Sequence, residues 1–199
     1  MWIPTALFEV HAFWLQRIVR SDPERMRILG IVRELGLPDC WVAAGFVRNA
    51  IWNALHGRPV VQDYDDVDVI WFDGQADLGA PETIEAMLRR VDPSVRWSVK
   101  NQAQMHSRNA DPPYASSADA MCHWVETTAA IAVRLDSSGA VVFSAPLGTE
   151  DLFAMVIRPG PRFMSEKHGI FLERVREKCW FERWPLLRLI GEVPSPRRS

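Results

Sequence analysis

The stretch at residues 65–73, DDVDVIWFD, constrains the fold of this chain more than any other. It is rich in β-branched and aromatic residues, which predicts the central strand of a sheet. Because residues two apart on a strand point to the same face, Asp66 and Asp68 project together, with their Cα atoms roughly 6.5 to 7 Å apart. The pattern indicates a strand buried on both sides for most of its length, with two acids at one end. The residues expected on the opposite face are all apolar: Val67, Val69 and Trp71.

Two neighbouring carboxylates repel each other, and neither gains from burial. The pair is tolerated where a cation lies between the two groups or where both groups reach water. Oxygen ligands with open positions suit Mg²⁺, which keeps several waters and accepts phosphate oxygens. A lone Asp-x-Asp more often marks a solvated strand end. The alternative, a site in which Asp66 and Asp68 hold Mg²⁺ or Mn²⁺, gains support from the segment that precedes the strand.

That segment begins with Gly45, which lies between a short apolar run at residues 40–44 and a helical pattern at residues 46–57. The free N–H groups and the positive dipole end of such a helix form an anion site. A glycine also lets the backbone approach a phosphate closely. We therefore predict that Gly45 and Phe46 contribute to binding the phosphates of a nucleotide.

Two further pairs of polar residues have two interpretations each. Arg48 and Asn49 fall in the first turn of the predicted helix. They are either exposed or paired with Asp65, or they contact a triphosphate or a ribose. Lys100 and Asn101 follow a later predicted strand, where they either satisfy loop backbone groups or bind a phosphate and a base, respectively.

Helices and strands alternate along the rest of the chain, but their connections are too irregular for a doubly wound sheet. The predicted fold class is therefore α+β, with a mixed β-sheet and helices packed around it. We expect a single domain over residues 1–190, with a helical N-terminus (1–37), a core that carries the site (38–157), C-terminal helices (163–190) and a mobile tail (191–199). The other predicted elements are helices at 6–20, 23–36 and 81–90, strands at 95–100, 129–135 and 140–143, a helix that begins near 150, and a break in the last helical region at Pro185.

The order of these motifs resembles a known superfamily. Gly-Phe-Val-Arg-Asn, then His-Gly-Arg-Pro, then Asp-Val-Asp-Val resembles the polymerase-β-like nucleotidyltransferases, and this run is locally similar to that of the CCA-adding enzymes. Over nearly its whole length the chain resembles an uncharacterised bacterial nucleotidyltransferase-like family designated DUF925. VKNQAQMH (99–106), HWVETTAAIAVRL (123–135) and KCWFERWPLL (178–187) carry that likeness. The resemblance implies a nucleotidyltransferase fold, metal-dependent nucleotide handling and no established substrate.

The chain departs from the superfamily pattern at two points. Gly45-Phe46 stands where the turn usually has Gly-Ser or Gly-Gly. The third carboxylate, which the superfamily carries on a later strand, has no obvious counterpart. Glu126 is the first candidate because it lies just before an apolar strand, where it would complete the catalytic set with Asp66 and Asp68. Asp136 and Asp65 are the alternatives.

Composition limits the function further. The formal charge of −2 argues against a broad surface for nucleic acid. No apolar run approaches the roughly 18 to 20 residues of a membrane span, and three widely spaced cysteines suit a reducing compartment. We therefore expect a cytoplasmic protein.

The leading hypothesis is an enzyme that transfers a nucleotidyl group from a nucleoside triphosphate to an unknown acceptor hydroxyl, on a small molecule, an RNA end or a protein. The first alternative is a catalytically inactive nucleotide-binding module. The second is an interaction protein that uses the tryptophan-rich C-terminal surface. The same surface makes the chain a candidate homo-oligomer.

Overall fold

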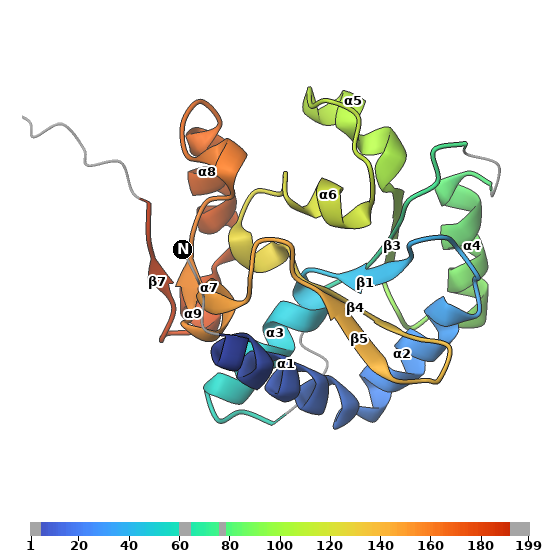
Figure 1. Ribbon diagram of the computed structural model, residues 1–199, viewed down its shortest axis with the longest axis horizontal. Helices are drawn as coiled ribbons and strands as arrows, with labels where there is room; N and C mark the ends of the chain where they lie inside the picture. Colours follow the sequence, from blue (N-terminus) through green and yellow to red (C-terminus); the bar gives the residue numbers. More distant parts are fainter. Residues whose placement is uncertain (1–4, 60–64, 76–78, 192–199) are drawn as a thin grey trace, which may run out of the picture.

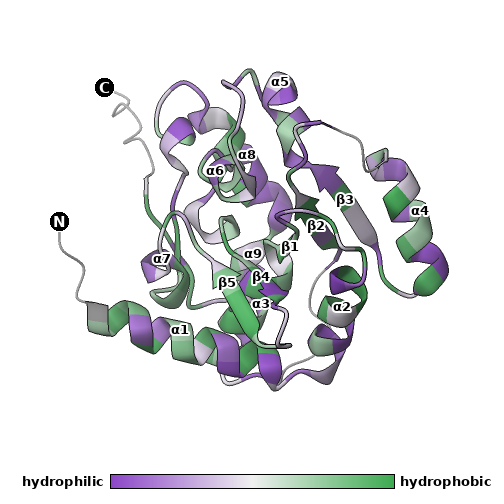
Figure 2. Ribbon diagram, turned by 45° about the vertical axis from the view of Figure 1, so that its right-hand side comes forward, coloured by the Kyte–Doolittle hydropathy of each residue, from purple (hydrophilic) through white to green (hydrophobic). Residues whose placement is uncertain are grey.

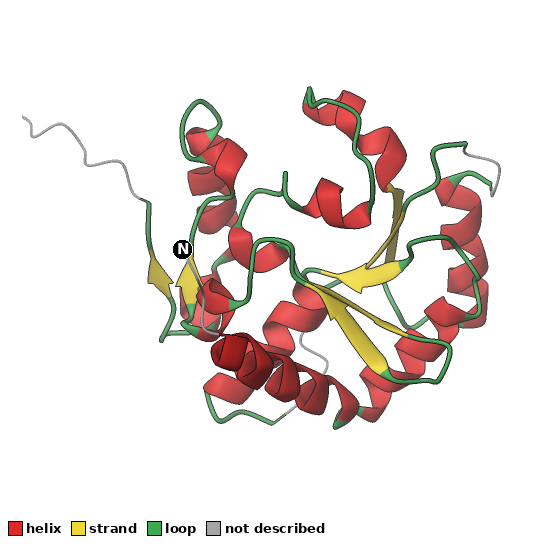
Figure 3. Ribbon diagram, in the orientation of Figure 1, coloured by secondary structure: helices red, strands yellow, loops and turns green. Residues whose placement is uncertain are grey.

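The protein has a five-stranded mixed sheet surrounded by helices (Figure 3). The computed structural model describes residues 5–59, 65–75 and 79–191. The strand order is β3-β2-β1-β4-β5, in which β2 and β3 are parallel and the other neighbouring pairs are antiparallel. This arrangement confirms the predicted α+β class. The strands are β1 (Trp41–Ala43), β2 (Val67–Trp71), β3 (Trp97–Asn101), β4 (Ala132–Leu135) and β5 (Val141–Ser144).

The prediction that residues 65–73 form the central strand is wrong in one respect. The centre of the sheet is β1, a strand of only three residues, and β2 lies beside it. The short strand is held on both edges, because Val42 pairs with Val69 of β2 and with Val133 of β4. The strand β2 is also hydrogen-bonded on both edges, and all its residues are buried except Asp68, which is partly exposed.

Helices cover the two faces of the sheet differently (Figure 1). On one side lie α1, α2 and α3; on the other lie α5, α6 and α8. Asp22 caps α2, since its carboxylate accepts hydrogen bonds from the backbone N–H groups of Glu24 and Arg25 at 3.0 and 3.2 Å. The helices are α1 (Thr5–Arg20), α2 (Pro23–Arg33), α3 (Gly45–Leu55), α4 (Pro81–Val91), α5 (Met105–Asn109), α6 (Ser117–Met121), α7 (Glu150–Phe153), α8 (His168–Lys178) and α9 (Trp180–Arg183), with 3₁₀ turns at Gln102–Gln104, Thr127–Ala129 and Pro161–Phe163.

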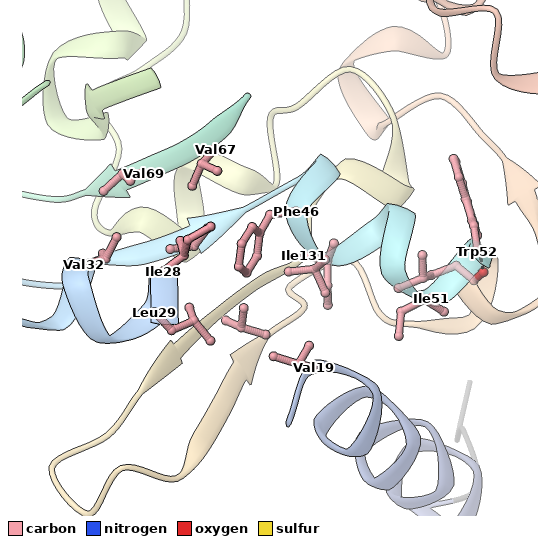
Figure 4. Packing of buried hydrophobic residues seen from close by; sticks show 14 of the residues in the cluster. Val19, Ile28, Leu29, Val32, Phe46, Ile51, Trp52, Val67, Val69 and Ile131 are labelled. Atoms are coloured by element: carbon pink, nitrogen blue, oxygen red, sulfur yellow. Dashed lines mark hydrogen bonds between the residues drawn. The ribbon is translucent and has the colours of Figure 1, made fainter. Parts of the chain in front are cut away.

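The main core lies between the sheet and the helices α1, α2 and α3 (Figure 4). Val67, Val69 and Trp71 are buried in this core, which confirms their predicted position on the face opposite the acids. A smaller apolar cluster covers the other face, where Ile70 packs with Trp41 of β1 and with neighbouring small residues. The sheet is thus fully packed on one face and only partly packed on the face that carries Asp68.

The C-terminal region differs from the prediction. The helical region is first interrupted at Cys179, whose backbone is left-handed (φ 47°), and α9 then ends at Arg183, just before the predicted break at Pro185. After α9 the chain forms β7 (Arg188–Leu189), which pairs in parallel with β6 (Val156–Ile157). The predicted mobile tail lies almost wholly outside the described residues. Two other predicted elements are shorter than expected: Thr127–Ala129 is a 3₁₀ turn before β4, and the helix at 150 has a single turn.

The first helix, α1, carries apolar side chains on more than one face (Figure 2). Leu15 and Val19 are buried in the main core, whereas Phe13 and Trp14 are about half exposed. None of the helices within the described ranges is long and apolar enough to cross a membrane.

Candidate active site

The two predicted metal ligands lie together in a cleft. Asp68 is in β2, where it pairs with Ala43 of β1 and Ser98 of β3, and Asp66 lies just before the strand. Both line a cleft of about 520 Å³, called here the large cleft. Its walls include Lys100 of β3, His123, and Ile170 and Arg174 of α8. The Asp68 side chain is 25% exposed, and its Oδ1 lies 3.5 Å from Lys100 Nζ. Lys100 therefore lies beside the acids, and its binding of a phosphate stays a prediction.

A second, smaller space meets the large cleft at the two acids. This small hollow has a volume of about 60 Å³ and includes Gly45 and Arg48 of α3, Asp65, and Arg183 of α9. The two spaces share part of their lining, so the acids stand at their junction. The shared residues are Ala44, Asp66, Asp68, Arg174 and Lys178.

The turn before α3 is strained at Ala44 and not at Gly45. Ala44 has φ 54° and ψ −120°, a conformation that costs a residue with a Cβ and that glycine adopts freely. It is held by a hydrogen bond from its N–H to the carbonyl of Ile131 at 2.9 Å. A Cβ added to Gly45 would lie 3.6 Å from Arg48 Nη2, an ordinary contact. Gly45 is the first residue of α3 as predicted, but the unusual backbone belongs to its neighbour.

Arg48 is buried and not on an exposed polar face. Its guanidinium lies over the rings of Trp52 and Trp180, at 5.0 and 4.6 Å from their centroids. Its ion-pair partner is Glu126, with Nη1 3.4 Å from Oε1, and not the predicted Asp65. Burial lowers the pKa of Arg48 to about 10, against the opposing attraction of Glu126, so the side chain stays cationic at neutral pH. Arg48 thus brings a positive charge beneath the small hollow.

Three other predicted nucleotide contacts have different surroundings. Phe46 is fully buried in the main core, so only its backbone can face a ligand. Asn49 is buried, and its Oδ1 accepts hydrogen bonds from Arg48. The predicted contact of Asn101 with a base is not supported, because its side chain bonds to the backbone of Asp73 and Ala103. This is the loop-satisfying role that was the alternative.

Glu126, the predicted third carboxylate, is a buried counter-ion. It is 0% exposed, and Arg174 donates from Nε at 2.8 Å and from Nη2 at 3.2 Å to its two oxygens. With Arg48 on the same carboxylate, two arginines face one acid, which leaves an excess positive charge beside Asp66 and Asp68. The role of Glu126 as a metal ligand stays a prediction, and its contacts favour the positioning of Arg174.

The alternatives to Glu126 can also be located. Ala132 is the β4 residue level with Asp68 across β1, so no acid stands at that position of the neighbouring strand. Asp136 lies beyond the other end of β4, where its carboxylate caps the turn to β5. Asp65 is exposed and lines the small hollow.

The donor set nevertheless suits Mg²⁺ or Mn²⁺. Among the described residues, no group of three or more His, Cys, Asp or Glu side chains converges as a ready-made metal cage. Mg²⁺ commonly binds through one or two carboxylates and completes its shell with waters and substrate phosphates. The carboxylates of Asp66 and Asp68, which lie beside cationic side chains, match that pattern.

The contribution of α8 to the site was not predicted from the sequence. The large cleft is lined by four residues in or next to α8, and their spacing places them on one helical face: Lys167, Ile170, Arg174 and Lys178. That spacing was a usable signal, but it shows only that the residues share a face. That this face lies opposite β2 depends on how α8 packs in the folded chain.

Comparison with known proteins agrees with this geometry. Residues 30–189 match the model of a family described as nucleotidyltransferase. The chain belongs to this nucleotidyltransferase family. A solution structure described as revealing a CCA-adding enzyme head domain is 34% identical, covers 89% of this chain and 95% of its own, and superposes with a TM-score of 0.78. Comparison with curated proteins finds no match.

More distant members of the fold are complete CCA-adding enzymes. The Thermotoga maritima enzyme in complex with tRNA is 16% identical with a TM-score of 0.54, and 91% of this chain covers 43% of it. A CCA-adding enzyme in complex with ATP is 17% identical with a TM-score of 0.52, and 88% of this chain covers 42% of it. These likenesses show the nucleotidyltransferase fold. The likeness to the uncharacterised bacterial family DUF925 stays a prediction.

Proposed function

We propose that this chain transfers a nucleotidyl group from a nucleoside triphosphate to an acceptor hydroxyl and releases pyrophosphate. The observation that carries the proposal is the position of Asp66 and Asp68, at the junction of two spaces and next to several cations. A bound Mg²⁺ or Mn²⁺ would stabilise charge on the attacking and leaving oxygens. Asp66 and Asp68 would hold the ion.

The remaining residues bind and orient the phosphates. The N-terminus of α3, an 11-residue helix, presents backbone N–H groups and its positive dipole end to the small hollow. Lys178 and Arg174 extend into both spaces, and Lys100 lies beside Asp68. Glu126 keeps Arg174 in place through two hydrogen bonds. These groups act as fixed charges that hold the triphosphate against the metal.

Calorimetric titration of ATP, GTP, CTP and UTP tests this function in the presence of Mg²⁺ or Mn²⁺. The experiment compares the wild type with the double variant Asp66→Asn/Asp68→Asn. We expect metal-dependent binding to the wild type and its loss in the variant, because amides do not replace two anionic ligands. Unchanged nucleotide and Mn²⁺ affinity in the folded variant would refute the site.

One observation favours a second function, a nucleotide-binding module without turnover. Ala132 stands where the neighbouring strand would present an acid to the metal, and Glu126 is already paired with two arginines. Such a module would bind nucleotides with metal but release no pyrophosphate with any acceptor. A pyrophosphate-release assay with a panel of hydroxyl acceptors therefore separates it from the enzyme.

A further inference from the structure

The two spaces that meet at Asp66 and Asp68 differ in chemistry. Cations line the small hollow around the first turn of α3, where the helix N-terminus adds its own positive potential. Three aspartates and two tryptophans, Trp180 and Trp184, line the hollow as well. Its volume of about 60 Å³ is far below the roughly 300 to 1,000 Å³ of sites that enclose a small molecule, so it suits a compact polyanion better than a nucleoside. The four cationic side chains of the small hollow are Arg48, Arg174, Lys178 and Arg183.

Beyond the acids, the large cleft becomes mixed, with apolar side chains among polar ones. Ile170 is 52% exposed although it faces this cleft, so a large aliphatic surface lies open to whatever binds there. Ligand sites are typically lined by apolar side chains with a few placed polar groups. The other large apolar residues of the cleft are Ile70, Met105, Trp124 and Phe163.

His123 supplies a polar group in the same part of the cleft. Its Nδ1 is buried, and neither ring nitrogen has a hydrogen-bond partner within the part of the chain that the structure describes. The nearest acid is Asp111, whose Oδ2 lies 3.8 Å from Nδ1. The ring is also 4.9 Å from that of Tyr114, centroid to centroid. The imidazole is therefore held in place by Asp111 and Tyr114, and about a quarter of the His123 side chain is exposed in the lining of the cleft.

Asp111 and its partners hold this wall of the cleft together. The Asp111 side chain is 2% exposed, accepts a hydrogen bond from the Tyr114 hydroxyl at 2.5 Å and pairs with Arg162 at 2.6 Å. Lys167, the residue before α8, lies 3.9 Å from the same carboxylate. The segment after α5 is thereby tied to the start of α8, next to His123.

The helix α8 runs alongside both spaces and relates their positions to each other. Lys178, at its end, lines both spaces, whereas Ile170 lines only the large cleft. At 1.5 Å per residue, the eight steps along the helix from Ile170 to Lys178 span about 12 Å. The helix face therefore runs from the cationic hollow, past the acids, to the mixed end of the cleft.

From this order we infer that the acids divide the nucleotide site in two. The small hollow takes the β and γ phosphates, and the large cleft takes the nucleoside, whose base contacts Ile170 and His123. The inference rests on the proposed function and adds to it the orientation of the substrate and two residues that recognise its base.

Inorganic tripolyphosphate separates the two halves experimentally, because it has the phosphates of a nucleotide and no base. Its affinity and those of the four nucleoside triphosphates are measured with Mn²⁺ by calorimetry. The double variant Ile170→Ala/His123→Ala removes the two base contacts. Leu186→Ala is the matched control, since Leu186 is 55% exposed and lines neither space. Lys178→Ala tests the phosphate end, with the exposed Arg176→Ala of the same helix as its control.

We expect Ile170→Ala/His123→Ala to weaken nucleotide binding about tenfold, since a base contact of this kind contributes on the order of 1 to 3 kcal/mol. The affinity for tripolyphosphate should stay the same. Lys178→Ala should weaken both ligands by a similar factor of about five. Both control variants should behave as the wild type.

An equal loss for tripolyphosphate and ATP in the double variant, or no loss for either, would overturn the inference. So would a wild type that binds tripolyphosphate as tightly as every nucleotide, although the metal and phosphate site would then stand. A wild type that binds neither ligand would overturn the proposed function together with the inference.

Discussion

Asp68 and Glu126 are two carboxylates of one cleft in opposite states. Asp68 is a quarter exposed, and its only charged contact among the described residues is Lys100 at 3.5 Å. Glu126 is fully buried and accepts from two arginines. A carboxylate that is saturated by cations has little capacity left for a metal ion, whereas one that faces a cleft beside a second acid retains it. The difference indicates that Glu126 stabilises the fold, whereas Asp68 is available to a ligand.

The contrast between the two carboxylates also explains the role of Arg174. Arg174 is shared between Glu126 and the cleft, so the buried acid orients a cation that faces the exposed acids. A positioned arginine offers a phosphate several donors in a fixed geometry. In this account Glu126 contributes to nucleotide binding through Arg174.

The largest expected effect is on stability. Glu126→Ala leaves the buried Arg48 and the partly exposed Arg174 without their counter-ion, which should lower the free energy of unfolding by about 3 to 5 kcal/mol. Asp68→Ala, the matched variant of the exposed acid, should change it by less than about 0.5 kcal/mol. Urea denaturation measures both. Equal small losses would mean that the Glu126 ion pairs do not hold the cleft together.

A smaller effect is expected at Ala44, which lines both spaces between the two carboxylates. Ala44→Gly relieves a backbone conformation that costs roughly 1 to 3 kcal/mol but adds roughly 0.5 to 1 kcal/mol of chain entropy in the unfolded state. We expect a net stabilisation of about 1 kcal/mol in thermal or urea unfolding.

Gly45→Ala is the control for that substitution, because its added Cβ meets only ordinary contacts. Its unfolding free energy should stay close to that of the wild type. A destabilised Ala44→Gly, or a strongly destabilised Gly45→Ala, would contradict the assignment of the strain to Ala44.

The smallest expected effect lies outside the cleft. Burial lowers the pKa of His11, against an opposing effect of Glu150, and its Nδ1 lies 2.9 Å from the Thr149 hydroxyl. As the pH falls through about 6.5, the unfolded chain takes up a proton that the folded chain resists. Stability should therefore fall on acidification, until the pH passes the lowered pKa of the folded state. In His11→Gln the slope of stability against pH should be smaller between about pH 7 and about pH 5. Identical slopes would place the acid-sensitive group elsewhere.

The sequence was sufficient to predict how Asp66 and Asp68 are placed, but it was not sufficient to predict the residues around them. The two-residue period of a strand predicted that Asp66 and Asp68 face one way and Val67 and Val69 the other, because that property is local. The start of α3 at Gly45 was also predictable, from a glycine before a helical period. These are short-range patterns with a direct physical cause.

The partners of Arg48 and Glu126 could not be predicted in this way. Arg48 and Glu126 are 78 residues apart in the sequence, and Glu126 and Arg174 are 48 residues apart. Such pairs depend on how segments far apart in the sequence come together in the folded chain, which no local period encodes. The strain at Ala44 was missed for a similar reason, since a hydrogen bond to Ile131 helps to hold it.

Binding of Mn²⁺, followed by electron paramagnetic resonance with and without ATP, tests the central claim most directly. The proteins compared are the wild type, Asp66→Asn/Asp68→Asn and Glu126→Gln, each shown to be folded by circular dichroism. We predict that the double variant loses Mn²⁺ binding and that Glu126→Gln retains it, even where its ATP affinity falls. A double variant that binds Mn²⁺ as the wild type does, or a folded Glu126→Gln that loses the ion, would contradict the account.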